Sequence, residues 1–219
     1  DWLLRGELPQ NGAVVKTIVT TDLVGEIAGD RGVTCFDVLT GFKYIGELMS
    51  EWEVSGAHTF LFGAEESHGY LLGTHARDKD AIVMGCCIAE MAHAAKKEGK
   101  TLIDQLDLIY KRYGHYVEET RSISLEGDVA ALKRVMEGVR KKPLREIGGR
   151  AVKKIVDYSC DETGLPPSNV IAYTLDDGTK LIVRPSGTEP KMKLYGMGKG
   201  DAKGLSALLT ALADTLSMR

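Results

Sequence analysis

The sequence predicts two domains, an α/β domain of three layers followed by an α+β domain. Over residues 1–114, β-rich apolar runs alternate with helical patterns, which is typical of a mixed sheet with helices on both faces. Over residues 115–219, a strand and a helix precede a run of strands and a last helix, which indicates an antiparallel sheet with helices on one face. The length of 219 residues suits two domains of about 100 residues each. The turn Tyr113-Gly114-His115 marks the boundary.

Composition limits the classes of protein to which the chain can belong. Hydrophobic residues make up 43% and charged residues 27%, which favours a packed core over disorder. The net charge of −3 argues against a nucleic-acid-binding surface. No apolar run of roughly 18 residues predicts a membrane span, and no signal-peptide pattern opens the chain. The four cysteines lack CxxC spacing, so we expect free thiols in a reducing cytoplasm: Cys35, Cys86, Cys87 and Cys160.

The first domain begins with the pattern of an amphipathic helix end at residues 1–5, so we expect a C-terminal piece of a longer protein. The nearly continuous apolar run 13–19 predicts a strand buried on both faces. Thr20 and Thr21 offer an N-cap to a short helix over 22–29. The elements that follow are a strand over 33–39, a helix from residue 41, a strand over 58–62, and helices over 81–97 and 101–113.

The helix over 81–97 is apolar nearly all round, so we expect it to be well buried. In the second domain, alternation of apolar and polar residues predicts a strand over 117–125, and helical periodicity predicts a helix over 128–140. The remaining elements are strands over 152–158, 169–175, 179–183 and 192–197, and a last amphipathic helix over 201–216.

The loop 184–191 lies between the last two predicted strands. Its two prolines lack the N–H group that a ladder needs, and Gly187 permits unusual backbone conformations. Ser186, Gly187 and Thr188 contribute backbone N–H groups and two hydroxyls, and Arg184 stands at the base of the loop. Curved backbone amides and a guanidinium suit an oxyanion such as phosphate. On composition alone, a wide hairpin loop with ordinary turn residues is the alternative.

A second group, Thr40-Gly41-Phe42-Lys43, follows a predicted strand. In α/β sheets, ligands bind beyond the carboxyl ends of the strands. Lys43 lies in the first turn of its helix, where a cation opposes the helix dipole. A bound anion nearby would explain this placement, and a solvated lysine is the alternative.

A third group, Glu65-Glu66-Ser67-His68-Gly69, follows the next predicted strand. Two carboxylates and a hydroxyl between glycines can accept hydrogen bonds from several ligand hydroxyls, as in sugar recognition. Paired acids also occur in glycosidases and metal sites, but loop neighbours need not face each other, and no third acid has ligand-like spacing. A solvated acidic loop is the remaining alternative.

The fourth group, Arg77-Asp78-Lys79-Asp80, immediately precedes the helix over 81–97. Asp78 or Asp80 suits the N-cap of that helix, because an acid there accepts from free backbone N–H groups. Arg77 and Lys79 can instead face a phosphate.

Together, the motifs at 40–43, 65–69, 77–80 and 184–190 resemble those of the phosphohexomutases, the phosphoglucomutase/phosphomannomutase family. The resemblance covers essentially the whole chain, in order and spacing. It implies domain three over 1–114 and domain four over 115–219 of a four-domain enzyme, the fourth with a TATA-box-binding-protein-like fold. The serine motif of domain one (TASHNP-like) and the metal loop of domain two (DGDGDR-like) do not occur in the sequence.

The resemblance implies a cytoplasmic isomerase that interconverts hexose 1-phosphate and hexose 6-phosphate through a bisphosphate intermediate. The phosphoserine and the Mg²⁺ of such an enzyme would belong to N-terminal domains one and two, so the fragment alone is expected to be inactive, with no metal ligand and no catalytic nucleophile of its own. Hexose 1,6-bisphosphate would act as activator and intermediate. The expected partners are a small phosphosugar and the two N-terminal domains, without nucleic acid or membrane.

The same resemblance implies that three sets of residues bind different parts of the substrate. Sugar hydroxyls would be bound by Glu66 and Ser67, with Glu65 and Gly69 beside them. The reacting end of the substrate would be touched by two assisting residues, Lys43 and Lys79. The phosphate that is not reacting would be held by Arg184, Ser186, Gly187 and Thr188.

The sugar loop also bears on the branch of the family. A Glu-Glu-Ser-x-Gly loop resembles the phosphoglucomutase and phosphopentomutase branch, whereas phosphomannomutase loops usually carry Met or Gln in place of Glu66. Phosphopentomutase or phosphomannomutase activity is therefore an alternative, and so is a non-catalytic sugar-phosphate-binding module. A serine loop and an acidic metal loop in upstream sequence would favour the enzyme.

Overall fold

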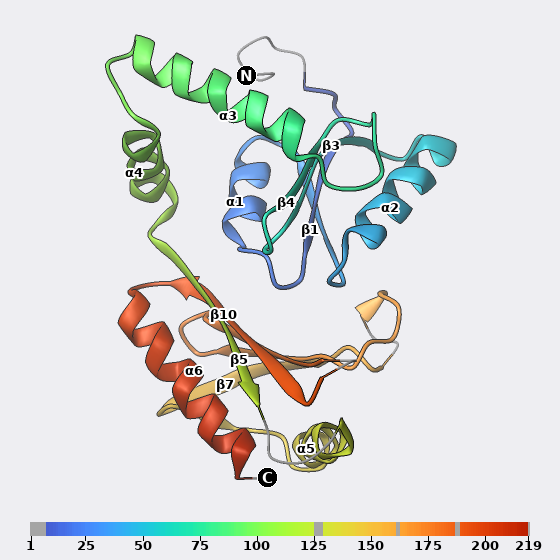
Figure 1. Ribbon diagram of the computed structural model, residues 1–219, viewed down its shortest axis with the longest axis vertical. Coiled ribbons are helices and arrows are strands. Elements are labelled where there is room, and N and C mark those ends of the chain that lie inside the picture. The colour runs from blue at the N-terminus through green and yellow to red at the C-terminus, as the bar shows by residue number, and fades with distance from the viewer. Residues whose placement is uncertain (1–7, 125–128, 161–162, 187–188, 219) are drawn as a thin grey trace. The chain divides into compact units, whose positions relative to one another are not determined.

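The structure is a computed structural model that describes residues 8–124, 129–160, 163–186 and 189–218. The chain divides into two compact units, a first unit of residues 1–114 and a second unit of residues 115–219. Figure 1 shows the helices and strands of each unit. The helix end expected at residues 1–5 lies outside the described residues, as do Gly187 and Thr188 of the predicted phosphate loop.

The first unit contains a mixed sheet with the strand order β2-β1-β3-β4. Strand β1 (Gly12–Thr17) lies in the middle and pairs in parallel with β2 (Thr34–Val38) and β3 (Thr59–Glu65). The edge strand β4 (Gly69–Leu72) runs antiparallel to β3. The carboxyl ends of β1, β2 and β3 therefore meet at one edge of the sheet.

Helices cover both faces of this sheet, as the sequence predicts. Successive residues of β1 point to opposite faces. Val15 packs in the cluster beneath α2 (Phe42–Ser55), whereas Val14 packs in the cluster beneath α1 (Leu23–Asp30). Both are apolar because neither face of a central strand meets water, which confirms the expectation of a strand buried on both sides.

Two local expectations for this unit are wrong. The residue before α1 is Asp22, which makes no side-chain cap hydrogen bond, so neither threonine is the N-cap, although the Thr21 hydroxyl accepts from the N–H of Leu23. Strand β3 continues to Glu65 instead of ending at residue 62, and the chain turns back as β4. The sequence Gly63-Ala64-Glu65 shows no alternation because Gly63 packs closely under Ile45, where a side chain would not fit.

Helices α3 (Ala81–Lys97) and α4 (Leu102–Tyr113) have the predicted extents, but the expected burial of α3 is wrong. Ala95 is the single buried residue of α3, and the exposed fractions of Ile82 and Met91 are 82% and 58%. Helix α3 contacts the edge strand β4 and helix α4, because α1 and α2 already cover the faces of the sheet. Its apolar composition therefore does not mark a core helix.

The second unit is built on an antiparallel sheet with the strand order β5-β10-β9-β8-β7-β6. Most elements lie where the periodicity predicts them, and the two-residue strand β6 is too short to leave a pattern. The strands are β5 (Tyr116–Ser124), β6 (Glu146–Ile147), β7 (Arg150–Asp157), β8 (Ile171–Leu175), β9 (Lys180–Pro185) and β10 (Lys191–Lys199). The helices are α5 (Val129–Lys141) and α6 (Ala202–Ser217).

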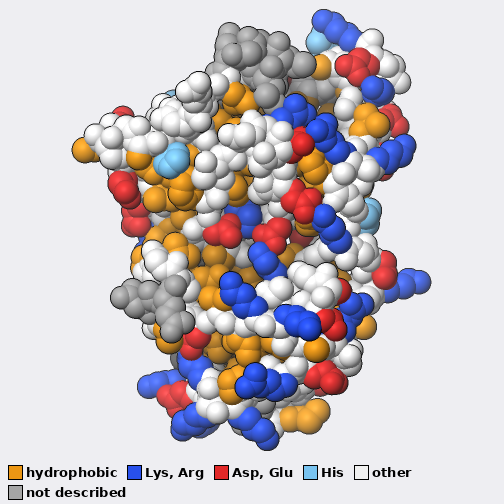
Figure 2. Space-filling view, turned by 180° about the vertical axis from the view of Figure 1, so that it is seen from behind, with side chains coloured by type: hydrophobic (Ala, Val, Ile, Leu, Met, Phe, Trp, Pro, Cys, Tyr) orange, Lys and Arg blue, Asp and Glu red, His pale blue; other side chains and the backbone are white. Residues whose placement is uncertain are grey.

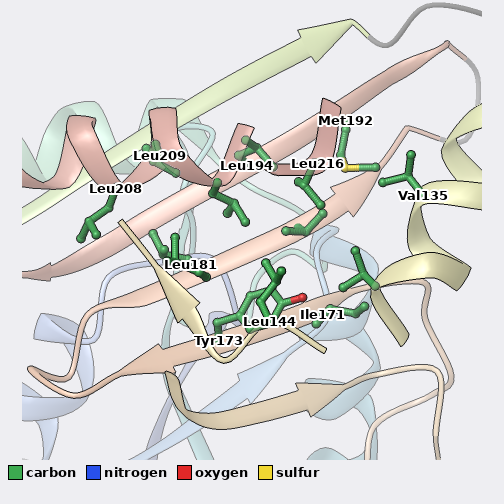
Figure 3. Packing of buried hydrophobic residues seen from close by; sticks show 14 of the residues in the cluster. Val135, Leu144, Ile171, Tyr173, Leu181, Met192, Leu194, Leu208, Leu209 and Leu216 are labelled. Atoms are coloured by element: carbon green, nitrogen blue, oxygen red, sulfur yellow. The ribbon is translucent and has the colours of Figure 1, made fainter. Parts of the chain in front are cut away.

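A single hydrophobic core joins both helices of the second unit to the same face of its sheet (Figure 3). Leu209 and Leu216 of α6 and Val135 of α5 pack with Leu181 and Leu194 of the strands. Gly196 of β10 lets α6 approach closely, because a Cβ atom there would lie 2.8 Å from Leu205. A curled antiparallel sheet with helices on one face agrees with the TATA-box-binding-protein-like description.

The surface carries charges of both signs. Figure 2 shows acidic and basic side chains interspersed over one face of the molecule, in keeping with the net charge of −3. The four cysteines are free thiols. Within the described residues, we find no helix that combines the length and the apolar character needed to cross a bilayer.

Candidate functional site

Three of the four sequence motifs meet at the carboxyl end of the first sheet. The ammonium of Lys79 lies 2.9 Å from Glu65 Oε1, and it lies over the ring of Phe42, 5.9 Å from the centroid. The hydrogen bond to Glu65 is the main reason that the pKa of Lys79 is raised above its ordinary value. Lys79 is therefore a partly exposed cation at neutral pH, held by a carboxylate that ends β3.

Glu65 is buried at this position, with 6% of its surface exposed. Gly69, its partner across the β3–β4 ladder, leaves the room that the carboxylate occupies. A Cβ atom on residue 69 would lie 2.4 Å from Glu65 Oε1, closer than any real contact. The glycine of the predicted sugar loop thus has a steric role, since it admits the Glu65 side chain.

The Glu66 side chain has a different partner from that of Glu65. Its Oε2 accepts a hydrogen bond of 3.2 Å from the Thr17 hydroxyl at the end of β1. Glu65 ends β3 and binds the Lys79 ammonium, whereas Glu66 lies in the turn after β3 and binds the Thr17 hydroxyl, so the two carboxylates have separate partners. This geometry does not support a glycosidase-like pair that faces one bond.

Ser67 and His68 complete the loop and are exposed. His68 has a φ of 63°, in the left-handed region that few residues other than glycine adopt. The turn between β3 and β4 therefore presents the Ser67 hydroxyl to solvent, where a ligand can reach it.

Lys43 is exposed in the first turn of α2 and lies 4.6 Å from the centroid of the Tyr44 ring. The residue before α2, Gly41, has a φ of 119° and supplies no side-chain cap, and the first turn of α2 carries no acid. The helix N-terminus thus offers backbone N–H groups beside a cation, which is favourable for an anion.

The remaining residues of the fourth motif have structural partners. Arg77 donates to Glu53 over 2.5 Å and to the carbonyl of Thr74 over 2.8 Å. Asp80 is the N-cap of α3 and accepts from the N–H groups of Ile82 and Val83. The hydrogen bond from Val83 is the main reason that the pKa of Asp80 is lowered. Asp80 is therefore the acid that caps the helix, and Lys79 is the residue of the motif that faces the sugar loop.

The phosphate loop of the second unit is described only in part. Arg184 lies on β9 and pairs with Lys193 of β10, and the N–H of Ser186 donates to the carbonyl of Lys191 over 2.8 Å. The Ser186 hydroxyl accepts from the N–H of Glu189. The base of the loop is closed in this way, and within the described residues Arg184 forms no ion pair with an acid.

The carboxyl end of β1 and the turn after it hold buried polar residues for which the sequence predicted no part in a ligand site. Lys16, Thr17 and Thr20 have exposed fractions of 2%, 0% and 6%. Their signal is two polar residues inside the apolar run 13–19 and a third just after it, where a central strand ends and where α/β sheets bind ligands. Among the described residues, no group of three or more His, Cys, Asp or Glu side chains is arranged to hold a metal ion.

Comparison with known families agrees with these motifs. The family domain described as phosphoglucomutase/phosphomannomutase, alpha/beta/alpha domain III, matches residues 1–113. The C-terminal domain of the same family matches residues 125–215.

Individual relatives give the same result. A probable phosphomannomutase of Haemophilus influenzae is 35% identical over 201 residues, which cover 91% of this chain and 39% of the relative. A phosphoglucomutase of Staphylococcus saprophyticus is 35% identical over 195 residues, which cover 83% of this chain and 35% of the relative. The chain thus spans 35 to 39% of the length of these relatives.

Solved structures show the same fold. The open form of pp63/parafusin (phosphoglucomutase) from Paramecium aligns with a TM-score of 0.71 and 21% identity over 94% of this chain and 37% of that one. A phosphoglucomutase/phosphomannomutase family protein of Burkholderia thailandensis aligns with a TM-score of 0.63 and 13% identity over 99% of this chain and 39% of that one. The chain therefore belongs to the phosphoglucomutase/phosphomannomutase family, of which it comprises domain III and the C-terminal domain.

Proposed function

We propose that the chain is the sugar-phosphate-binding part of a phosphoglucomutase-type enzyme that interconverts hexose 1-phosphate and hexose 6-phosphate. The observation that carries the proposal is the ion pair between Lys79 and Glu65, because it joins two motifs of the family at the carboxyl end of the sheet. A cation and a carboxylate at one place suit a ligand that carries both phosphate and hydroxyl groups.

The two units would contribute different contacts. Glu65, Glu66, Ser67 and Gly69 belong to the sugar loop of the first unit, and Lys43 and Lys79 supply positive charge in the same unit. Arg184, Ser186, Gly187 and Thr188 of the second unit would hold the phosphate that is not reacting. Phosphoryl transfer depends mostly on position and on charge stabilisation, which is what these residues can supply.

The phosphoryl-carrying serine and the Mg²⁺ would be supplied by parts of the enzyme outside this chain, in a cytoplasmic protein. The residues of this chain would bind and orient the substrate and its hexose 1,6-bisphosphate intermediate. We therefore expect the chain alone to bind glucose 1-phosphate without converting it. Clear mutase turnover by this chain alone would contradict that division of roles.

Calorimetric titration of the chain with glucose 1-phosphate tests the proposal. Arg184→Ala is expected to weaken binding by roughly 10- to 100-fold, because a hydrogen bond to a charged group contributes about 1.5–3 kcal/mol. Arg150→Ala is the matched control, since Arg150 is a partly exposed arginine of the same unit that pairs with Asp177. Equal losses in both variants, or no binding by the unmodified chain, would overturn the proposal. A panel with mannose 1-phosphate and ribose 1-phosphate would identify the preferred sugar.

A further inference from the structure

Buried polar residues at the carboxyl end of β1 are hydrogen-bonded to the sugar loop, and the role that we assign to them rests on the proposed function. We infer that Thr17 and Thr20 are positioning residues that hold the Glu66 carboxylate, and with it the sugar loop, in the orientation that recognises sugar hydroxyls. Lys16 sets the position of Thr20. None of the three residues belongs to a motif that the resemblance singled out.

The direction of the hydrogen bonds follows from their chemistry. The hydroxyls of Thr17 and Thr20 lie 2.8 Å apart, and the Thr17 hydroxyl lies 3.2 Å from Glu66 Oε2. An ionised carboxylate only accepts, and a hydroxyl has one proton to donate. Thr17 therefore donates to Glu66, and Thr20 donates to Thr17.

Lys16 fixes the start of the chain of hydrogen bonds that runs from Thr20 through Thr17 to Glu66, which we call the relay. Its ammonium donates to the carbonyl of Thr20 over 3.1 Å and pairs with Asp22 over 3.1 Å and with Asp37 over 2.8 Å. An ammonium has three N–H donors, and each of them has an acceptor here. The turn that carries the Thr20 hydroxyl is thereby tied to β1 and to the end of β2.

The hydroxyl of Thr17 is not needed for packing. The side chain is fully buried, and valine has nearly the same shape with a methyl group in place of the hydroxyl. A buried hydroxyl costs free energy unless it is hydrogen-bonded, so its bonds are what it contributes at this site. One of those bonds reaches the sugar loop across 49 residues of sequence.

The bond also uses only one side of the carboxylate. With Oε2 held by Thr17, the Glu66 side chain cannot rotate freely, and the loop that continues into Ser67 and His68 is tied to the central strand. A binding group that is ordered before the ligand arrives loses less conformational entropy on binding. The relay therefore favours tight binding of sugar hydroxyls without touching the sugar itself.

The test compares Thr17→Val, which removes the hydroxyl and keeps the shape, with Thr17→Ser, which keeps the hydroxyl. We expect Thr17→Val to weaken glucose 1-phosphate binding by roughly tenfold, as for one hydrogen bond to a charged group, and Thr17→Ser to stay within about twofold. Inorganic phosphate, used as the second probe, should bind all three proteins equally, because it has no hydroxyls for the sugar loop to recognise.

A double-mutant cycle with Glu66→Ala separates positioning from a general structural effect. If Thr17 acts through Glu66, Thr17→Val has no further effect on affinity in the Glu66→Ala background. Losses that add in the double variant would overturn the inference, as would equal affinities of Thr17→Val and Thr17→Ser.

Amide hydrogen exchange of residues 66–68 distinguishes failure of the relay from failure of the proposed function. Faster exchange in Thr17→Val than in Thr17→Ser supports the relay, and equal exchange overturns it, whether or not a sugar phosphate binds. If the unmodified chain binds glucose 1-phosphate no better than inorganic phosphate, the proposed function fails, and the role assigned to the relay in sugar recognition fails with it.

Discussion

Lys79 and Glu65 form an ion pair across 14 residues, with 2.9 Å between Nζ and Oε1, and the two partners differ in exposure. The side chain of Lys79 is 52% exposed, whereas that of Glu65 is 7% exposed. Loss of Glu65 and loss of Lys79 therefore have different consequences for stability. Without Glu65, the ammonium is left beside water, but without Lys79 a carboxylate is left buried without its partner.

This asymmetry predicts that Lys79→Met destabilises the first unit more than Glu65→Gln does. We expect a loss of about 1–3 kcal/mol in the free energy of unfolding for Lys79→Met, because a buried acceptor loses its donor. Urea unfolding followed by tryptophan emission measures it, since Trp2 and Trp52 both belong to residues 1–114. Lys43→Met, at an exposed lysine, serves as the control and should lie near the unmodified protein. A loss in Lys79→Met no larger than that in Glu65→Gln would refute the asymmetry.

A second prediction concerns the space beside Glu65. Gly69→Ala places a methyl group where the carboxylate lies, so we expect the Glu65 side chain to be displaced and glucose 1-phosphate to bind more weakly. Gly85→Ala is the matched control, because a Cβ atom at that position of α3 meets nothing within 4 Å. The control should bind normally and gain about 1 kcal/mol in the free energy of unfolding, since alanine favours helix over glycine. Normal binding by Gly69→Ala would show that this space is not needed.

A third prediction concerns thiol reactivity. Burial raises the pKa of Cys35 to about 11, whereas Cys86 and Cys160 are exposed. At pH 8 about one in a thousand Cys35 thiols is ionised, and the thiolate is the form that reacts. Iodoacetamide labelling followed by peptide mass spectrometry should therefore modify Cys86 and Cys160 long before Cys35. Labelling in urea is the control, in which all three should react, and equal rates in the folded chain would contradict the assignment.

A fourth prediction concerns Lys16 at alkaline pH. Burial is the largest single influence on the pKa of Lys16 and lowers it, but attraction by Asp37 and Asp22 outweighs burial and leaves the pKa above 10.5. The folded state thus holds this proton more tightly than the unfolded state does. The contribution of Lys16 to stability is complete below pH 10.5 and is lost as the pH rises through the pKa of the folded state.

Urea unfolding between pH 8 and pH 12 measures this loss. Lys16→Met lacks the titrating group, so its stability should fall less steeply, by at most about 1.4 kcal/mol per pH unit, the value for one proton. Parallel curves for the two proteins would exclude a contribution from Lys16.

The sequence predicted the elements well where the periodicity extended over many residues, as in α5, α6 and β5. It missed β4 and β6, which have four and two residues and are too short for alternation to show. The prediction that α3 is buried was wrong for another reason. Composition shows that a helix is apolar, but it does not show that α1 and α2 already cover both faces of the sheet.

The candidate site was predictable to the extent that it follows from the carboxyl ends of strands. That rule placed Glu65 near the sheet edge, and the resemblance placed Lys79 near the substrate, but neither predicted the bond between them. The bond from Thr17 to Glu66 was not predictable, because it depends on the register of β1 against β3, in which Lys16 lies opposite Ala64. Register is decided by packing, and a shift of one residue would turn Thr17 to the other face.

The exposed apolar side chains of helix α3 make the chain sensitive to the kind of salt in solution. Its isoleucine and methionine side chains meet water along a helix that takes no part in the sugar loop. Salts such as sulfate, which are excluded from protein surfaces, strengthen the tendency of such side chains to leave water. Ionic composition therefore acts on two separate properties of this chain. Excluded salts favour burial of the exposed α3 side chains, while ionic strength screens the attraction between phosphate and Lys43, Lys79 or Arg184.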